Sequence, residues 1–244
     1  MPRLTSRLLL SFAAVIAGLL IVPTYGAVPA RPGWRVVLVA GDNGEPVFDN
    51  GVAAMAQWLG KLGVPGTDIH RFSATPMPGA EPASATGILH QIATLGARPG
   101  ERCFVFMTSH GQHDEGMWLA YSGEFLRPQA LATALSAGCG AVPTVVIVSA
   151  CYSGSFSGPV MQAPNRIVMT AARGDRPSFG CQADRNYTVF DECLLGTLPQ
   201  ATSWQQEYAI NSTCVRQHEK ELEVRPSLPQ AFFGPAVRKL PIVQ

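Results

Sequence analysis

Charge is scarce in this 244-residue sequence, since Asp, Glu, Lys and Arg make up 14% of it, against roughly 25% in ordinary soluble domains. The 18 basic and 17 acidic residues nearly balance, which excludes the concentrated basic face that nucleic-acid binding requires. The sequence also lacks internal repeats, low-complexity segments and a Cys-x-x-Cys pair, and the last absence disfavours a thiol-disulfide redox protein. With 47% apolar residues, the chain is instead predicted to bury a substantial core.

The N-terminus carries an apolar run of its own. Arg3 and Arg7 precede an apolar stretch over residues 8–22, and small residues follow it, which is the pattern of a secretory signal peptide. A run of about 15 residues is shorter than the roughly 18 or more that a spanning helix needs, so cleaved export is favoured over an N-terminal membrane anchor. We therefore predict a signal over residues 1–30, a single domain over residues 31–244, and an exported, periplasmic or secreted protein.

The 6 cysteines suggest disulfides in an exported chain, although they are too sparse for a disulfide scaffold. If Cys151 is kept free for chemistry, an odd number remains and at least one more is unpaired. Cys181, Cys193 and Cys214 lie in one C-terminal region and are the strongest candidates for a bridge, whereas Cys103 opens an apolar strand and suits the core. The connectivity itself stays open at this point.

Short apolar runs alternate with helical stretches along the rest of the chain. The expected strands are Arg35–Ala40, Cys103–Thr108, Thr144–Ala150 and Arg166–Thr170, with a final one within Pro226–Gly234. The expected helices are Gly51–Leu62, Ala85–Leu95, Pro128–Leu135, Asn186–Leu195 and Ser203–Leu222. The runs are apolar on both faces, as strands covered on both sides should be. The alternation predicts an α/β fold with a mostly parallel sheet.

A histidine and a cysteine follow two of the expected strands. His110 comes just after Cys103–Thr108, and Cys151 directly follows Ala150. Catalytic residues of such sheets gather at the carboxyl ends of the strands, and a cysteine nucleophile needs a nearby imidazole. Alone, each residue would be interpreted as a structural thiol or a turn histidine, but at matching strand ends they indicate a nucleophile and its base. The backbone N–H groups of Gly111 and Cys151 are suited to stabilise an oxyanion.

These motifs resemble those of the legumain-like cysteine peptidases of the caspase-fold clan, in a bacterial-type exported form. The resemblance rests on Ser-His-Gly at 109–111, Ser-Ala-Cys-Tyr-Ser-Gly at 149–154, VVLVAGDNG at 36–44 and TAARGDRPSFGC at 170–181. It implies a caspase-like three-layer α/β/α fold and a cysteine endopeptidase that acts on peptide or protein substrates without a cofactor. It also implies that Cys151 is the nucleophile, His110 the general base and acid, and Gly111 an oxyanion-hole donor.

The chain departs from the family pattern in the residues that surround this pair. The family has a catalytic asparagine after its first strand, followed by an Arg-His pair, but here the stretch reads EPVFDNG and the pair is missing. Asn50 is the candidate for the third catalytic residue, with Asn43 as the alternative. The acidic residue two positions before the family's nucleophile is Ser149 here, so asparaginyl specificity is not implied. We place Ser149 in the substrate-binding region with Asp49 and Asp191, two carboxylates that would suit a basic or amide side chain.

Other functions compete with hydrolysis of peptide bonds. The same chemistry could transfer the acyl group to an amine, as transamidase members of the family do, and a caspase-fold scaffold could bind a peptide without cleaving it. The residues His110, His113, Asp114 and Glu115 could be proposed as a zinc site, but a solvated polar loop is the favoured interpretation and no metal is expected. The oligomeric state is not predicted.

Overall fold

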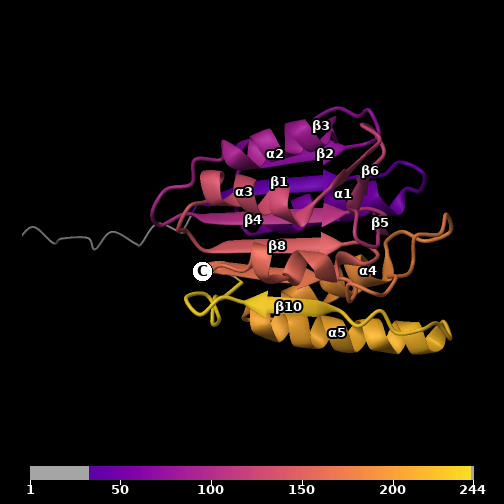
Figure 1. The fold of residues 1–244 in the computed structure, drawn as a ribbon. Helices are drawn as coiled ribbons and strands as arrows, with labels where there is room; N and C mark the ends of the chain where they lie inside the picture. The colour runs from indigo at the N-terminus through magenta and orange to yellow at the C-terminus, as the bar shows by residue number, and fades with distance from the viewer. Residues whose placement is uncertain (1–32, 243–244) are drawn as a thin grey trace, which may run out of the picture. The chain divides into compact units, whose positions relative to one another are not determined.

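A computed structural model describes residues 33–242, so the predicted signal over residues 1–30 lies outside the described part of the chain. These residues build a seven-stranded sheet in the order β10-β9-β8-β4-β1-β2-β3 (Figure 1). The strands are β1 (Trp34–Ala40), β2 (Ile69–Ser73), β3 (Glu81–Pro82), β4 (Arg102–Thr108), β8 (Thr144–Ser149), β9 (Arg166–Thr170) and β10 (Gln230–Phe233). Every pairing in this sheet is parallel except that of β10 with β9.

The central strands are buried on both faces, which explains why they read as continuous apolar runs. All residues of β4 and β8 are buried. Because side chains alternate along a strand, Val36, Leu38 and Phe104 enter one hydrophobic core, whereas Val37 and Val105 enter the other. The sheet therefore separates two cores and needs helices on both sides.

Five helices supply that cover. Helices α1 (Val47–Lys61), α4 (Val189–Thr197) and α5 (Trp204–Glu221) bury side chains in one core, and α2 (Ala85–Ala93) and α3 (Pro128–Gly138) bury theirs in the other (Figure 1). The side chains of Ser84, Thr188 and Ser203 accept a backbone hydrogen bond at the first turns of α2, α4 and α5. The predicted three-layer α/β/α fold with a mostly parallel sheet is confirmed. None of the helices within residues 33–242 has both the length and the apolar character to cross a membrane.

A small antiparallel sheet follows the carboxyl end of β4. It consists of β5 (Gly111–Gln112), β6 (Gly116–Leu119) and β7 (Glu124–Leu126). His113 and Asp114 are exposed in the turn between β5 and β6, as the expected polar loop requires. The flanking strands were not predicted, because they are too short to show an alternating pattern.

Several element boundaries differ from the expected ones. Helix α1 begins at Val47 and not at Gly51, since the turn residue Pro46 already adopts helical angles. Helix α4 begins at Val189 and not at Asn186, because Thr188 caps it. Strand β2 was missed because its His70 and Arg71 are only partly buried near the sheet edge, so it has no continuous apolar run.

Two disulfides link the described residues. Cys193 pairs with Cys214 between α4 and α5, within the trio of cysteines predicted to hold a bridge. Cys103 is fully buried as expected, but it also pairs with Cys139, a bridge that the sequence analysis did not predict. Cys151 and Cys181 are free.

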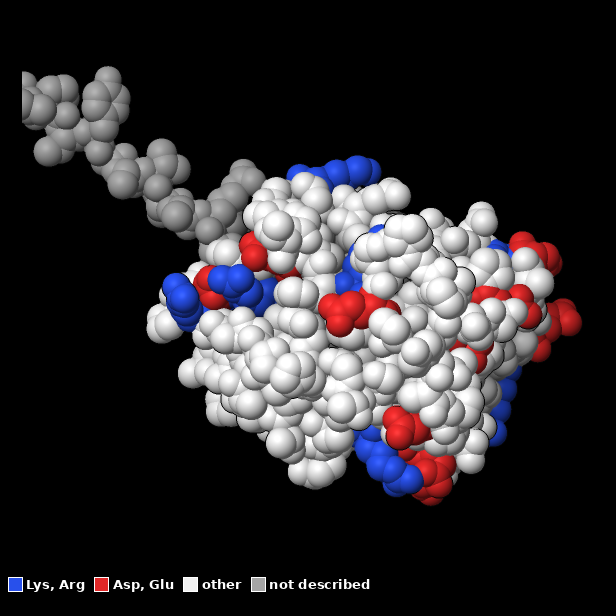
Figure 2. Space-filling view, turned by 90° about the horizontal axis from the view of Figure 1, so that it is seen from above, with Lys and Arg blue, Asp and Glu red and all other residues white. Residues whose placement is uncertain are grey.

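The charged side chains stand in small groups of mixed sign on the face shown in Figure 2. Uncharged areas separate these groups. Among the ion pairs of the described residues, Arg35 lies 3.1 Å from Asp68 and 2.7 Å from Glu101.

Candidate active site

His110 and Cys151 stand side by side at the carboxyl end of the sheet. Strands β4 and β8 are parallel neighbours, and their register pairs Thr108 with Ser149. The Ser109 N–H continues the ladder by donating to the Ser149 carbonyl at 3.1 Å. Two residues beyond the last register pair, the chain reaches His110 on one side and Cys151 on the other. The predicted meeting of these residues at one sheet edge therefore follows from the strand register.

Gly111 packs directly against the backbone of the cysteine. A Cβ atom at this position would lie 2.2 Å from the Cys151 carbonyl oxygen and 3.2 Å from the Ala150 Cβ. Real Cβ atoms do not approach backbone oxygens so closely, so only glycine fits. This contact joins the turn after β4 to the turn that carries the thiol.

The thiol of Cys151 is half-buried and surrounded by the segment that follows β9. The Ser178 N–H donates to the Cys151 Sγ at 3.3 Å, and the Ser178 Oγ lies 3.7 Å from the same sulfur. The Cys151 Sγ in turn donates to the Ser178 carbonyl at 3.5 Å, so Ser178 contacts the sulfur through its backbone N–H, its hydroxyl and its carbonyl. These contacts fix the position of the Cys151 sulfur.

The turn after Cys151 is fixed to that same segment. Tyr152 has a φ of 57° and donates its backbone N–H to the Arg176 carbonyl at 2.8 Å. The Ser153 Oγ accepts from the Ala172 N–H at 3.2 Å. A Cβ atom on Gly154 would lie 2.3 Å from the Gly174 nitrogen. The two motifs at 149–154 and 170–181 are therefore one packed unit.

The imidazole of His110 is positioned by packing. The ring contacts Phe48 edge to face, with the ring centroids 5.2 Å apart. The backbone carbonyl of His110 accepts a hydrogen bond from the Trp118 N–H at 3.0 Å. His113 has different partners, since its Nδ1 lies 2.8 Å from Asp114 and its ring packs against Tyr152. The two histidines are thus held by separate contacts.

The candidates for the third catalytic residue lie at the start of α1 and in the turn before it. Asn50 is half-buried in α1, and Asn43 is exposed with its Nδ2 donating to the Ala74 carbonyl at 3.4 Å. Within residues 33–242, no hydrogen bond joins either side chain to His110. Phe48, which was not among the predicted site residues, supplies the contact to the imidazole.

The predicted substrate-binding carboxylates lie at two different places. Asp49 accepts hydrogen bonds from Ser73 and Thr75, both at 2.7 Å, at the end of β2. Asp191 has no exposed surface and accepts from the Thr108 hydroxyl at 2.7 Å. Burial raises the pKa of Asp191 to about 6, although hydroxyl donors oppose the shift.

Ser149 is buried at the end of β8, where its Oγ lies 3.3 Å from the Thr188 Oγ1. Thr188 also caps α4, the helix that carries Asp191. Ser149 and Asp191 therefore belong to one hydroxyl and carboxylate cluster behind the ends of β4 and β8.

Two further acidic residues act electrostatically on the Cys181 thiol. Burial raises the pKa of the Cys181 thiol, and the negative charges of Cys151, Glu45 and Asp42 raise it further. Asp42 lies within the segment at 36–44 that carries the resemblance, and Glu45 opens the stretch EPVFDNG, but neither residue was predicted to bind substrate.

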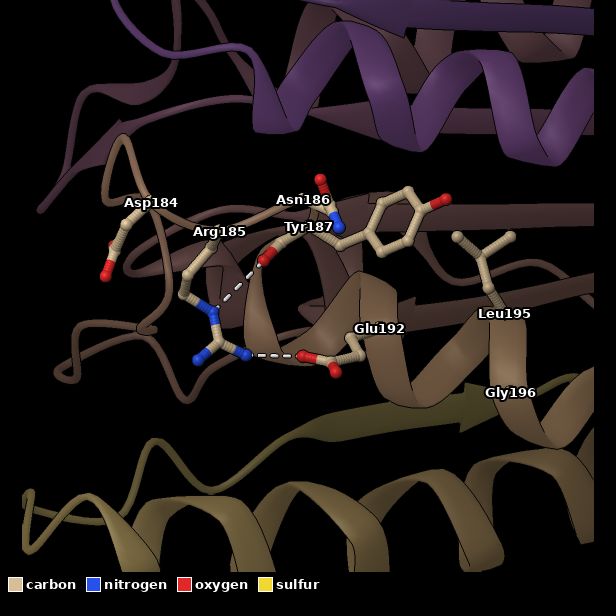
Figure 3. A pocket seen from close by; sticks show the side chains of 7 residues that line it. All are labelled: Asp184, Arg185, Asn186, Tyr187, Glu192, Leu195 and Gly196. Carbon is tan, nitrogen blue, oxygen red and sulfur yellow. Dashed lines mark hydrogen bonds and ion pairs between the residues drawn. The ribbon is translucent and has the colours of Figure 1, made fainter.

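Pockets surround this end of the sheet. One of about 510 Å³ lies over α4 and the loop before it, where Arg185 pairs with Glu192 and donates to the Tyr187 carbonyl at 3.3 Å (Figure 3). Neither His110 nor Cys151 lines this pocket. Its lining residues are Asp184, Arg185, Asn186, Tyr187, Glu192, Leu195 and Gly196. A second pocket of about 370 Å³ does include His110.

Within residues 33–242, one trio of side chains has ligand atoms close enough to hold a metal, namely Cys193, Cys214 and His218. Its two cysteines are joined in a disulfide, so they offer no thiolate.

Comparison with known families agrees with the geometry. The chain matches the peptidase C13 family over residues 82–222, a segment that contains His110, Cys151 and Asp191 and spans more than half of the sequence. No curated protein matches the chain. The resemblance to legumain-like peptidases is confirmed, as is the expectation of an enzyme. The chain therefore belongs to the peptidase C13 family, the legumain family of cysteine peptidases.

Proposed function

We propose that this cysteine peptidase hydrolyses peptide bonds through a dyad of Cys151 and His110 and a thioester acyl-enzyme. The observation that carries the proposal is the adjacency of the two residues at the ends of the paired strands β4 and β8. The contacts of Ser178 with the Cys151 sulfur support its role as the nucleophile, because they fix the position of the sulfur.

Acylation uses the dyad and the backbone of the Gly111 turn. His110 takes the thiol proton, and the Cys151 sulfur attacks the carbonyl carbon to form a tetrahedral oxyanion. The backbone N–H groups of Gly111 and Cys151 donate to that oxygen. When the intermediate collapses, the C–N bond breaks and His110 gives its proton to the leaving amine, which leaves a thioester on Cys151.

Deacylation repeats the same steps with water. His110 takes a proton from water, whose oxygen attacks the thioester carbonyl. Collapse breaks the C–S bond, releases the carboxylic acid and returns the proton to the sulfur. An amine that replaces water would give acyl transfer, and product analysis with an added amine separates the two outcomes.

The acyl side of the site prefers a basic or amide side chain. The negative charges of Asp42 and Glu45, which raise the pKa of the Cys181 thiol, support this preference. Asp191 and Ser149 are buried behind the strand ends and act only through the hydroxyl groups that they contact, whereas Asp49 at the end of β2 is partly exposed. Asn50 is the candidate for the third catalytic residue. A peptide library that showed a preference for acidic side chains would contradict this specificity.

The enzyme is exported, to the periplasm or out of the cell, after cleavage of the signal over residues 1–30. The two disulfides support an oxidising compartment. Mass spectrometry of the mature N-terminus tests the cleavage, and an intact Met1 would favour an N-terminal membrane anchor.

Labelling by iodoacetamide across pH tests the dyad. We expect rapid labelling of Cys151, a thiolate pKa that rises in His110→Ala, and no change in His113→Ala, because His113 packs outside the dyad. Cys151→Ala should abolish both labelling at this position and peptide cleavage. Slow labelling that His110→Ala leaves unchanged would identify an ordinary thiol and favour a peptide-binding scaffold.

A further inference from the structure

The pocket beside His110 has an aromatic wall. It is lined by His110, Gly111, Gln112, Trp118 and Phe125 and measures about 370 Å³, within the usual range for small-ligand sites. Trp118 and Phe125 are a cross-strand pair of β6 and β7, with ring centroids 5.0 Å apart. The wall is therefore a preformed apolar surface next to the imidazole.

These two rings do not belong to the cores of the protein. Their neighbours Met117, Leu119 and Leu126 are buried in the core on the side of α2 and α3, whereas Trp118 and Phe125 are partly exposed and pack against neither core. Alternation along the strands points the two rings to the open face of the small sheet. Folding alone does not explain two aromatic residues there.

The pocket is fixed to the proposed general acid. The Trp118 N–H donates to the His110 carbonyl at 3.0 Å, and the Ser109 Oγ donates to the Trp118 carbonyl at 2.7 Å. Gly111 pairs with Met117 in the same small sheet. The aromatic wall therefore holds a set position relative to the imidazole.

The position of the pocket relative to Cys151 indicates which part of the substrate would bind in it. Cys151 follows β8, whose neighbours are β9 on one side and β4 on the other. Ser178, from the segment after β9, contacts the sulfur, and His110 follows β4 on the opposite side. A general acid must lie within hydrogen-bond reach of the amine it protonates. The leaving peptide consequently passes His110 and reaches the aromatic wall.

We propose that Trp118 and Phe125 form the subsite for an apolar, preferably aromatic, side chain within the first two residues after the cleaved bond. The inference rests on the proposed dyad and adds a second determinant of specificity, on the leaving-group side. Peptides with an acidic side chain at that place are poorer substrates, because the carboxylate loses solvation against the two rings.

A series of internally quenched peptides tests the proposal. All of them share the same residues before the cleaved bond, and each of the first two positions after the bond is varied among Phe, Leu, Ala, Asp and Lys. A peptidyl methyl ester with the same acyl part is the control, because its leaving group has no side chain. We expect kcat/KM to favour Phe over Asp by about 10- to 100-fold, the range for burial of one large apolar side chain. Trp118→Ala and Phe125→Ala should bring the ratio of kcat/KM for the Phe and Asp peptides close to 1, whatever each variant does to methyl ester hydrolysis.

Two further variants separate recognition from a structural effect. Phe125→Arg should shift the preference toward Asp, which a damaged fold cannot do. Tyr121→Ala removes an aromatic ring that is 54% exposed and lies outside the pocket, so it should change nothing. Methyl ester turnover without any preference after the bond would overturn the inference and leave the dyad intact. Failure of both substrate types, with slow labelling of Cys151, would overturn the dyad and this inference with it.

Discussion

Gly111 and Cys151 are in backbone contact, and a Cβ atom on the glycine would lie 2.2 Å from the carbonyl oxygen of the cysteine. The contact couples the histidine turn to the nucleophile turn across the ends of β4 and β8. Any side chain at position 111 must push the two turns apart, because the atom it meets is backbone.

Gly111→Ala is therefore expected to reduce kcat/KM by about 100-fold, the scale that a displacement of roughly 1 Å produces in a catalytic site. The labelling rate of Cys151 should fall as well. Gly60→Ala is the matched control, since no atom lies within 4 Å of a Cβ at this position in α1, and it should keep full activity with slightly higher stability. Equal activity of the two variants would show that the close contact is irrelevant to catalysis.

The two free cysteines should differ in reactivity. Burial and the neighbouring negative charges raise the pKa of the Cys181 thiol, whereas Cys151 has the proposed base His110 at the end of the adjacent strand. At pH 7 we expect iodoacetamide to modify Cys151 at least 10 times faster than Cys181, because the thiolate is the nucleophile. Peptide mapping by mass spectrometry measures the two rates, and preferential labelling of Cys181 would contradict this assignment.

The sequence predicted those parts of the site that follow from strand register. The runs that became β4 and β8 were evident because both faces of each strand are apolar, and His110 and Cys151 immediately follow them. Parallel neighbours end at one edge, so the meeting of the two residues followed from the pattern alone.

The contacts that depend on tertiary packing were not predictable. Nothing local marks Phe48 as the partner of His110, since it is one apolar residue in the first turn of α1. The pairing of Cys103 with Cys139 was hidden because Cys103 reads as an ordinary core residue of a strand. Strands β5 to β7 have two to four residues each, too few for a periodic signal.

Removal of the bridge between α4 and α5 should destabilise the protein. The Cys193–Cys214 disulfide closes a loop with a sequence separation of 21, and a loop of this length stabilises by about 3 kcal/mol in the chain-entropy model. Chemical unfolding of the double variant Cys193→Ala, Cys214→Ala, without reductant, should show this loss. Cys181→Ala breaks no bridge, so an equal loss in that variant would assign the effect to packing.

Asp191→Asn should change how stability depends on pH. Burial raises the pKa of Asp191 from 3.8 to about 6, so the folded protein binds its proton more tightly than the unfolded chain does. This contribution to stability is complete below pH 4 and is lost as the pH rises through 6, an amount of roughly 3 kcal/mol. The asparagine does not titrate, so the unfolding free energy of the variant should fall less between pH 4 and pH 7.

Glu207→Gln is the control that separates stability from catalysis. Burial also raises the pKa of Glu207, from 4.5 to about 7, but this residue lies on α5 and accepts from Thr197, away from the dyad. Asp191→Asn and Glu207→Gln should both make the unfolding free energy less dependent on pH. For Glu207→Gln the effect should appear over the higher range, from pH 4.5 to about 7. Because Asp191 bonds to Thr108 at the end of the strand that leads to His110, only Asp191→Asn should also alter the pH profile of kcat/KM. An identical change of that profile in both variants would mean that the buried carboxylates act on the whole fold and not on the site.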